Sequence, residues 1–405
     1  QVQELPRKEH QLKPYRNFKS AMPRIIFHID VNSAFLSWSA VKLILEGKPD
    51  IRLVPSVVSG DPNDRRSIIT AASIPAKKLG IKTAMPVSMA LRTCPNLIIV
   101  RGDWEWYKRC SEGFIEICRS YSPVLQQFSI DECFIDCTQY LHFYREEAIR
   151  ANVDPAHVMA MTMIRDVLST TGITATVGIG TNLYLAKVAM DIVAKKSPAD
   201  KDGVRIAELN EDSYKFLLWD HKPLTDFWQI GIGKARRLEK AAMFTMGDVA
   251  ARTQWDEEFF YKTFGIDGEI LIDHAWGIES VTMKDIKSNK SEGHSLSNGQ
   301  VLPRPYKYQE AKLVFKEMIE VLCTDMFSKN LVTQGCSWWV SYDYKSLEAC
   351  PLYDGPLSID FYGRIHPKHS NGTVKLPTLT NNLQIVMTPL LKQFDEKTDH
   401  RLLYR

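Results

Sequence analysis

Two carboxylates stand side by side in residues 129–136, whose sequence is SIDECFID. Asp131 and Glu132 follow the stretch PVLQQF at 123–128, and this pattern predicts two short strands that meet at an acidic turn. Adjacent carboxylates beside apolar strand residues are unfavourable unless a positive charge compensates them. A divalent cation is one such charge, because Mg²⁺ binds a few carboxylates and completes its shell with water or phosphate oxygens. A solvated surface turn is the alternative interpretation of the hairpin taken alone.

A third carboxylate lies upstream, where an apolar strand ends. Residues 24–29, RIIFHI, run directly into Asp30, and the polar pair Asn32 and Ser33 follows. An acid at such a strand end and the acidic hairpin can together form a cluster of three carboxylates. Two cations about 3.5–4 Å apart on such a cluster clamp the attacking and leaving oxygens of a phosphoryl transfer. The sequence allows this arrangement without requiring it.

The two segments resemble the catalytic motifs of the Y-family DNA polymerases, the DinB/UmuC superfamily of translesion enzymes. The run DVNS from Asp30, with Phe35 shortly after it, is similar to the UmuC-type form of the first motif, and SIDECFID is similar to the second. The resemblance extends from about residue 24 to the end of the chain and favours a bacterial member. It implies an α+β, multidomain fold, namely a right-hand polymerase with a palm, small fingers, a helix-hairpin-helix thumb and a C-terminal little finger domain.

The function that the resemblance implies is template-directed DNA synthesis of translesion type, in DNA damage tolerance and repair and the SOS response. The enzyme would add dNMP to a primer 3′ end by two-metal phosphoryl transfer and release pyrophosphate. Asp30, Asp131 and Glu132 are then catalytic, and together with Val31 they hold two Mg²⁺ ions, for which Mn²⁺ can substitute. The implied partners are primer–template DNA, dNTP, and a sliding clamp reached through a tail that this chain does not show.

The resemblance also assigns residues to the nucleotide. In the family, the aromatic residue at the position of Phe35 excludes ribonucleotides, because a ribose 2′-hydroxyl would clash with its ring; packing of a helix is the alternative role. The tyrosine and arginine that usually contact the triphosphate are replaced here by Ile74 and Lys77. Lys77 is still expected to bind a phosphate of the nucleotide as a point charge, although a lysine cannot reproduce a bidentate guanidinium. Lys195 is the best match to a later triphosphate-contacting lysine, although an apparent extra residue before Pro198 blurs the register.

Two glycine pairs invite a phosphate-binding interpretation. GIG at 178–180 follows a predicted strand at 173–177 and is expected to form a turn before a helix, but Leu183 replaces the third glycine of a dinucleotide motif, so that interpretation is rejected. The run QIGIGKARR from 229 lies between helical segments and resembles the helix-hairpin-helix of the family's thumb, whose backbone amides position DNA without reading its sequence. The predicted DNA-binding residues are Gly231, Gly233, Lys234, Arg236 and Arg237.

The domain organisation follows from turn signals, composition and the resemblance. A helix that begins at Trp104 is expected to turn an aromatic stripe toward the core, and a single helix is expected over 146–171, ending at Gly172. The predicted boundaries are 1–23 for a flexible basic arm, 24–34 and 102–204 for the palm, 35–101 for the fingers, 205–284 for the thumb, 285–291 for a linker and 292–405 for the little finger.

Composition limits the class of protein. The 405 residues are 44% hydrophobic and 24% charged, which is typical of a globular protein, and no apolar run approaches the roughly eighteen residues of a membrane span. The net charge of +3 says little about a polyanionic partner. Eight cysteines without a C-x-x-C pair favour reduced thiols in a cytoplasmic protein. The resemblance to a DNA polymerase implies association with the nucleoid and no membrane partner.

Two other functions are consistent with parts of the sequence. A non-catalytic DNA-binding adaptor would explain the losses at Ile74 and Lys77, and Ser39 where a glutamate is common in the family. The intact carboxylates argue against it. A two-metal nuclease would use similar carboxylates but has no use for an aromatic gate beneath a sugar.

Overall fold

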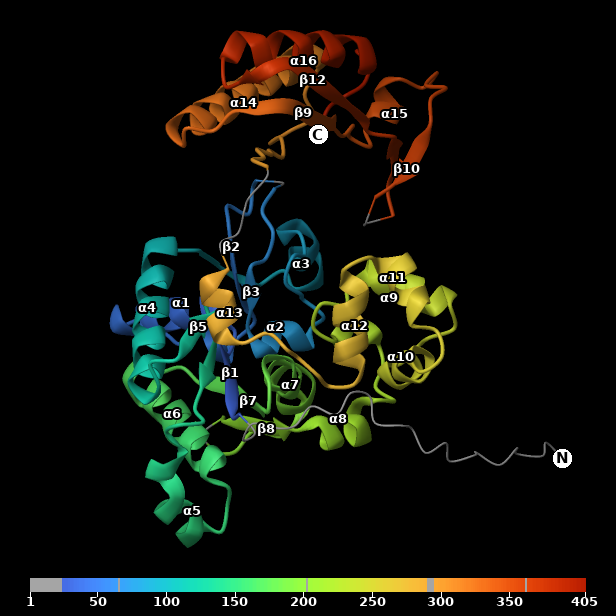
Figure 1. The fold of residues 1–405 in the computed structure, drawn as a ribbon. Helices are drawn as coiled ribbons and strands as arrows, with labels where there is room; N and C mark the ends of the chain where they lie inside the picture. Colours follow the sequence, from blue (N-terminus) through green and yellow to red (C-terminus); the bar gives the residue numbers. More distant parts are fainter. Residues whose placement is uncertain (1–23, 65, 202, 290–294, 361–362) are drawn as a thin grey trace, which may run out of the picture. The chain divides into compact units, whose positions relative to one another are not determined.

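The computed structural model describes residues 24–64, 66–201, 203–289, 295–360 and 363–405. The predicted basic arm at 1–23 lies outside these ranges. Contacts divide the described chain into two compact units. The first contains the residues up to 58, residues 70–80 and those from 100 to 289, and the second contains the remainder. Both units combine helices with strands (Figure 1), which confirms the predicted α+β class.

Five strands form the central sheet of the first unit, in the order β5-β6-β1-β7-β8. Strand β1 (Ile26–Val31) lies between β6 (Glu132–Asp136) and β7 (Ala175–Gly180) and is antiparallel to both. Strand β5 (Leu125–Gln127) pairs with β6, and β8 (Arg205–Leu209) runs parallel to β7. The predicted acidic hairpin is therefore confirmed as β5 and β6, and the strand that carries Asp30 lies directly beside it.

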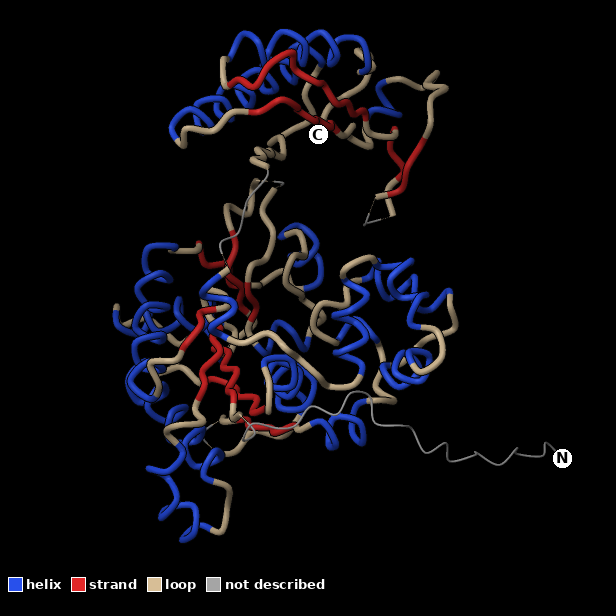
Figure 2. Tube along the Cα trace, viewed as in Figure 1, coloured by secondary structure: helices blue, strands red, loops and turns tan. Residues whose placement is uncertain are grey.

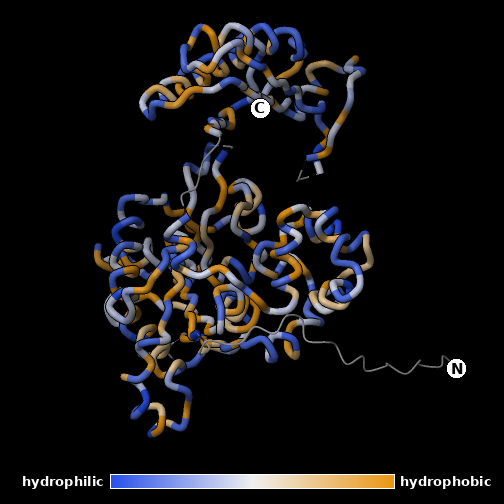
Figure 3. The backbone as a smooth tube through the Cα atoms, viewed as in Figure 1, coloured by the Kyte–Doolittle hydropathy of each residue, from blue (hydrophilic) through white to orange (hydrophobic). Residues whose placement is uncertain are grey.

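The alternation of side chains gives this sheet two different faces. One face is apolar and packs against helices α1 (Ala34–Leu45), α4 (Trp104–Tyr121) and α6 (Pro155–Thr171) to form a large core. Hydrophobic residues accordingly line the central strands (Figure 3). The other face carries the alternate residues of β1, His28 and Asp30, so the polar groups of the sheet lie on the side away from this core.

Gly178 and Gly180 are strand residues that let a helix approach the polar face closely. Helix α7 (Leu183–Val188), capped by Asn182, runs directly over them. A Cβ added at Gly178 would lie 2.1 Å from the carbonyl oxygen of Ala186, and one at Gly180 would lie 2.2 Å from the nitrogen of the same residue. The expected turn at 178–180 is therefore wrong. The glycines extend the strand and serve helix–sheet packing.

Helix α7 continues without a break into a π-helical turn at Ala189–Val193 and a 3₁₀ turn at Ala194–Lys196. A π turn accommodates one more residue than an α-helical turn at the same place. After these turns, Lys195 points back toward the sheet, where it contacts Asp30.

The helix expected over 146–171 is two helices. Helix α5 (Arg145–Ala151) ends at Asn152, which has a left-handed φ of 53°, and α6 starts again after the capping residue Asp154 with Pro155 in its first turn. The helix-ending and helix-starting residues at 152–155 thus decide the helix boundaries, although the apolar periodicity continues across them. The expected end at Gly172, with a φ of 69°, is confirmed.

Part of the expected linker at 285–291 is also helical. Helix α13 (Met283–Ser288) starts with reciprocal hydrogen bonds between Thr282 and Asp285, a capping box. Met283 is buried with Leu183 and Ala186 of α7, so α13 belongs to the first unit. The amphipathic pattern of α13 is short and lies in a lysine- and serine-rich stretch, so the sequence alone indicates a linker.

Most of a small sheet and a helical group make up the rest of the first unit. The sheet has the order β3-β2-β4, and the helical group has its own core, which includes Phe227 and Leu238. Their bounds are β2 (Ser56–Ser59), β3 (Ala71–Ala72), α2 (Ile74–Lys78), β4 (Ile98–Arg101), α8 (Glu211–Leu218), α9 (Ile232–Lys240), α10 (Met246–Thr253), α11 (Glu257–Phe264) and α12 (Asp267–Ala275).

The second unit is a smaller α+β body with helix α3 (Val87–Thr93) among its residues. Helices α14 (Tyr308–Ser328) and α16 (Leu383–Lys397) pack against each other and against the antiparallel pair β9 (Thr333–Val340) and β12 (Ser370–Thr380) (Figure 2). A short pair, β10 (Leu357–Ile359) and β11 (Ile365–Pro367), and helix α15 (Ser346–Ala349) complete it. Across all the ranges that the structure describes, no helix has both the length and the apolar character needed to cross a bilayer.

The contact between α7 and the sheet predicts the effect of adding one methyl group. Gly178→Ala should lower the free energy of unfolding by about 3 kcal/mol or more, because helix backbone rather than a flexible side chain occupies the space. Gly113→Ala on α4 is the matched control: nothing lies within 4 Å of its added Cβ, and alanine there should stabilise the helix by up to about 1 kcal/mol. Chemical denaturation of both variants makes the comparison, and equal stabilities would contradict this packing.

Candidate functional site

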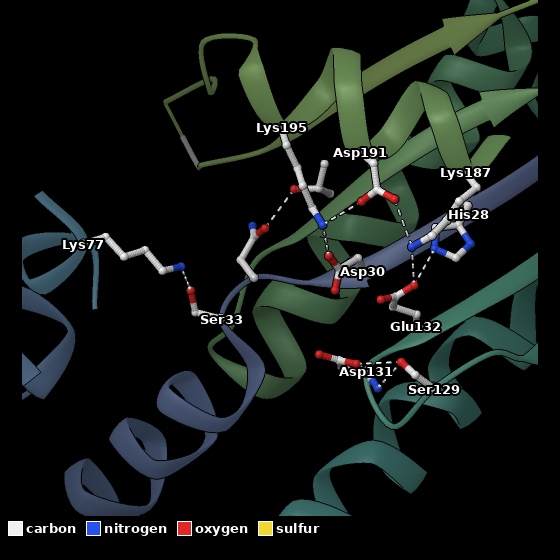
Figure 4. A network of polar contacts seen from close by, with 12 residues as sticks. His28, Asp30, Ser33, Lys77, Ser129, Asp131, Glu132, Lys187, Asp191 and Lys195 are labelled. Atoms are coloured by element: carbon white, nitrogen blue, oxygen red, sulfur yellow. Dashed lines mark hydrogen bonds and ion pairs between the residues drawn. The ribbon is translucent and has the colours of Figure 1, made fainter. Parts of the chain in front are cut away.

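Three carboxylates meet at the end of the polar face of the sheet (Figure 4). Asp30 lies directly opposite Glu132 in the β1–β6 ladder, and facing residues of an antiparallel pair project from the same side. Asp131 precedes β6, and its carbonyl oxygen accepts a hydrogen bond from the N–H of Val31 at 3.0 Å. One oxygen of each carboxylate lies within 4.8 Å of the others. The register of two strands therefore forms the cluster that the sequence allowed.

The helix that covers the two strand glycines presents three charged side chains to this cluster at intervals of four residues. The Nζ of Lys187 lies 2.6 Å from Oε2 of Glu132, and the Nζ of Lys195 lies 2.6 Å from Oδ2 of Asp30. Between them, Asp191 contacts Lys187 at 3.1 Å and Lys195 at 3.0 Å. The close approach of the helix thus brings two cations onto the acids of the sheet.

A buried histidine holds Glu132 from the strand side. His28 is fully buried, and its Nε2 lies 2.9 Å from the same Oε2 that Lys187 contacts. Burial lowers the pKa of His28, so the ring is neutral near pH 7 and Nε2–H donates to the carboxylate. Sequence reasoning missed His28 and Lys187. The available signals were the two-residue spacing of His28 from Asp30, which places both on one face of a strand, and the helical spacing of Lys187 from Lys195.

The pKa values of the acids reflect their different partners. Burial raises the pKa of Asp30 to about 6, which Lys195 only partly opposes, and repulsion from Glu132 and Asp131 acts in the same direction as burial. Burial also acts to raise the pKa of Glu132, but hydrogen bonds from His28 and from Lys187 outweigh it and bring the value down to about 2.

The donor set and the charge of the site fit a hard divalent cation. Four carboxylates, counting Asp191, stand against two ammonium groups, and the neutral His28 adds no charge. Carboxylate oxygens are the ligands that Mg²⁺ and Mn²⁺ accept, together with water and phosphate oxygens. The side chain of Val31 is buried in the apolar core, so this predicted metal residue can offer only backbone atoms.

The predicted nucleotide residues lie on elements next to the cluster. Phe35, in the first turn of α1, is half-buried. Lys77 on α2 donates from Nζ to Oγ of Ser33 at 2.9 Å, and burial together with repulsion from Lys195 lowers its pKa. Ile74, which replaces the family's tyrosine, is 62% exposed. Lys77 therefore brings a third ammonium group near the acidic cluster, on the side of α1.

The basic residues predicted for the helix-hairpin-helix divide into two kinds. Lys234 forms an ion pair with Asp267 at 2.9 Å, and Arg237 donates to the carbonyl oxygen of Thr263 at 2.8 Å. These two side chains fasten α9 to the helices that follow it. Arg236 is exposed and makes no hydrogen bond or ion pair with the residues that the structure describes. Both hairpin glycines are exposed, and nothing lies within 4 Å of an added Cβ at either.

Comparisons with known proteins converge on one family. Residues 29–191, which contain the three carboxylates, match the model of the impB/mucB/samB family. A DNA polymerase IV of Clostridium acetobutylicum is 32% identical over 282 residues, which are 69% of this chain and 65% of that protein. A DNA polymerase IV of Shewanella sp. (strain W3-18-1) is 32% identical over 275 residues, 67% of this chain and 68% of that protein.

A solved structure is also similar. A Y-family DNA polymerase chimera covers 94% of this chain, and 96% of its own chain is matched, with a TM-score of 0.60 and 17% sequence identity. This likeness shows the fold. The match to the Clostridium acetobutylicum protein, at 65% of its length, leaves about a third of that relative without a counterpart in the alignment.

The cluster predicts a cation site that can be measured without any reaction. Asp131→Asn should weaken Mn²⁺ binding at least about tenfold, since even changes around metal ligands typically reduce affinity 10- to 100-fold. Glu147→Gln, an exposed acid on α5, is the matched control and should leave binding unchanged. Titration of free Mn²⁺ by electron paramagnetic resonance gives both affinities. If the two variants bind equally, the three carboxylates do not form the site.

Proposed function

This chain belongs to the impB/mucB/samB family of Y-family DNA polymerases, and from that membership we propose that it is a template-directed DNA polymerase of translesion type. Its substrates are primer–template DNA and dNTP, and its products are a primer longer by one nucleotide and pyrophosphate. The observation that carries the proposal is the three-carboxylate cluster at the β1–β6 register, compensated by lysines from one helix. A non-catalytic adaptor has no need to keep buried acids together.

The proposed cofactor is a pair of Mg²⁺ ions, for which Mn²⁺ can substitute. Asp30, Asp131 and Glu132 would hold them, with the backbone of Val31 as a further oxygen donor. Bound there, the cations lower the pKa of the primer 3′-hydroxyl and neutralise charge on the triphosphate. The remaining work of the chain is to hold carboxylates, phosphates and sugar in a fixed geometry.

Lys187 and His28 are proposed to keep Glu132 in place throughout the reaction. Both donate to one oxygen of this carboxylate and leave the other free, which fixes its orientation. The side chain of Lys187 is only 8% exposed, and its Nζ is engaged by Glu132 and Asp191. It acts on Glu132 and is a positioning residue.

Lys195 and Lys77 are the proposed contacts of the triphosphate. The Lys195 side chain is 40% exposed and rests on Asp30, whose charge a cation would neutralise. Its ammonium group is then available to a phosphate oxygen. Lys77 presents a second ammonium group from α2 as a point charge. Because the family's tyrosine and arginine are absent, the proposed binding of the triphosphate is weak. A loosely held nucleotide agrees with an enzyme that tolerates damaged templates.

The domain boundaries predicted from the sequence are retained as a proposal. With these boundaries, strands β1, β5, β6 and β7 with helices α4 and α6 belong to the palm, α1 and the β3-β2-β4 sheet belong to the fingers, and β8 lies at the start of the thumb range. The helical group from α8 to α12 is the thumb, and the body built on α14 and α16 is the little finger. In the thumb, the amides at the start of α9 and the guanidinium of Arg236 would contact DNA phosphates. We also propose that the protein binds a sliding clamp and associates with the nucleoid.

Primer extension with dNTP and Mg²⁺ tests the proposed function. The parent should extend a primer, and Asp131→Asn should lower kcat/KM by roughly a hundredfold or more, because several kcal/mol of transition-state stabilisation depend on the metal ligands. Binding of primer–template, measured by fluorescence anisotropy, should stay within about twofold of the parent, and Glu147→Gln should resemble the parent in both assays.

The other outcomes identify the other functions. A parent that binds primer–template and leaves its length unchanged would be an adaptor. A parent that shortens the primer in the presence of the metal would be a nuclease. Extension by Asp131→Asn at the rate of the parent would contradict the assignment of the carboxylates.

A further inference from the structure

We propose that Trp104 is a specificity-determining residue, which braces the ring of Phe35 and so sets how strictly ribonucleotides are excluded. This inference rests on the proposed function and on the role of Phe35 as the steric gate in it. Trp104 is the first residue of α4, and its side chain is 59% exposed. The aromatic stripe expected to face the core is therefore split, because Tyr107 is buried and Trp104 is not.

The ring of Phe35 is surrounded by three other aromatic rings. Its centroid lies 5.2 Å from that of Trp104, at an interplanar angle of 75°, and 5.0 Å from that of Tyr107, at 36°. Trp38 contacts it edge-on at 6.0 Å. Such edge-to-face and tilted pairs are favourable beyond simple burial. Trp38 and Tyr107 also belong to the hydrophobic core, whereas Trp104 is largely exposed and packs on Phe35 and on Tyr107.

The position of Trp104 is fixed by polar contacts between α4 and α1. Polar contacts on both sides of this residue tie the first turn of α4 to the helix that carries Phe35. One of them uses Ser39, which stands where a glutamate is common in the family. The contacts are Lys42 Nζ–Asp103 Oδ2 at 2.5 Å, Ser39 Oγ–Tyr107 Oη at 2.5 Å and Trp106 Nε1–Trp38 O at 2.8 Å.

A steric gate discriminates only if the ring cannot move aside. Exclusion by repulsion requires that displacement of Phe35 be unfavourable. Its side chain is half-buried and can change rotamer only toward space that its neighbours leave open. Two of the neighbouring rings are held in the core, so Trp104 is the one of the three that supports Phe35 from the exposed side. Removing that indole opens space beside the gate without emptying the core.

The experiment compares kcat/KM for rCTP and dCTP opposite template G. Trp104→Ala should raise the rCTP/dCTP ratio roughly two- to tenfold, the range that corresponds to the loss of one aromatic pair contact, while kcat/KM for dCTP changes less than twofold. Trp104→Phe should restore most of the discrimination. Phe143→Ala, an exposed aromatic residue of the same unit at 72% exposure, is the matched control and should leave the ratio unchanged. Phe35→Ala supplies the upper limit, because the gate itself is absent.

The other outcomes contradict either the role of Trp104 or the proposed function. A ratio that stays fixed in Trp104→Ala while Phe35→Ala raises it would overturn the role of Trp104 and leave the gate intact. An equal fall in kcat/KM for both nucleotides would also overturn it, because that result shows a general structural or template-binding role. A parent that extends no primer would contradict the proposed function itself.

Discussion

The structure depends on one close contact, in which the helix that begins as α7 lies directly against the polar face of the central sheet. Two strand glycines make this contact possible, since a methyl group at either would enter the helix backbone. The contact brings Lys187 and Lys195 onto Glu132 and Asp30. Without those ammonium groups, three carboxylates on a largely buried face would repel one another and oppose folding. The packing of the central sheet and the electrostatics of the site are therefore a single constraint.

The two ends of this ionic network differ in how firmly they are held. At one end, His28 and the buried Lys187 both donate to Glu132, whose pKa falls to about 2. At the other, the more exposed Lys195 alone faces Asp30, whose pKa stays near 6. At the first end, the carboxylate of Glu132 is therefore held in a fixed position. Under the proposed function, the second end would exchange its lysine for a cation as the cation and the phosphates arrive together.

Much of the site could be predicted from the sequence, because carboxylates at the ends of predicted strands indicate a metal site by residue type and position alone. The acidic hairpin, Asp30 on the neighbouring strand and a lysine late in the helix after β7 all followed from local patterns or from the family resemblance. The role of the glycines at 178–180 could not follow, since a glycine that admits a helix looks the same in sequence as one that makes a turn. The π turn before Lys195 could not be predicted either. Which side chains at the end of the helix face the acids depends on how the helix packs on the sheet, and the local sequence does not specify that packing.

Other differences arose where local signals are hidden inside longer patterns. Asn152 and Asp154 divide one apolar periodicity into two helices, and a capping box makes a helix of part of the expected linker. Exposure is the property that sequence specifies least. Trp104 and Tyr107 belong to one aromatic run, yet only the contact of α4 with α1 decides which ring enters the core and which stays at the surface.

The most direct test of the account is a crystal structure with primer–template, Mn²⁺ and a non-hydrolysable dCTP analogue. Anomalous scattering should place manganese between Asp30, Asp131 and Glu132. The Nζ of Lys195 should have left Asp30 for the triphosphate, while the Nζ of Lys187 remains within hydrogen-bond distance of Glu132. Manganese bound elsewhere, or Lys195 still paired with Asp30 beneath a bound nucleotide, would contradict it.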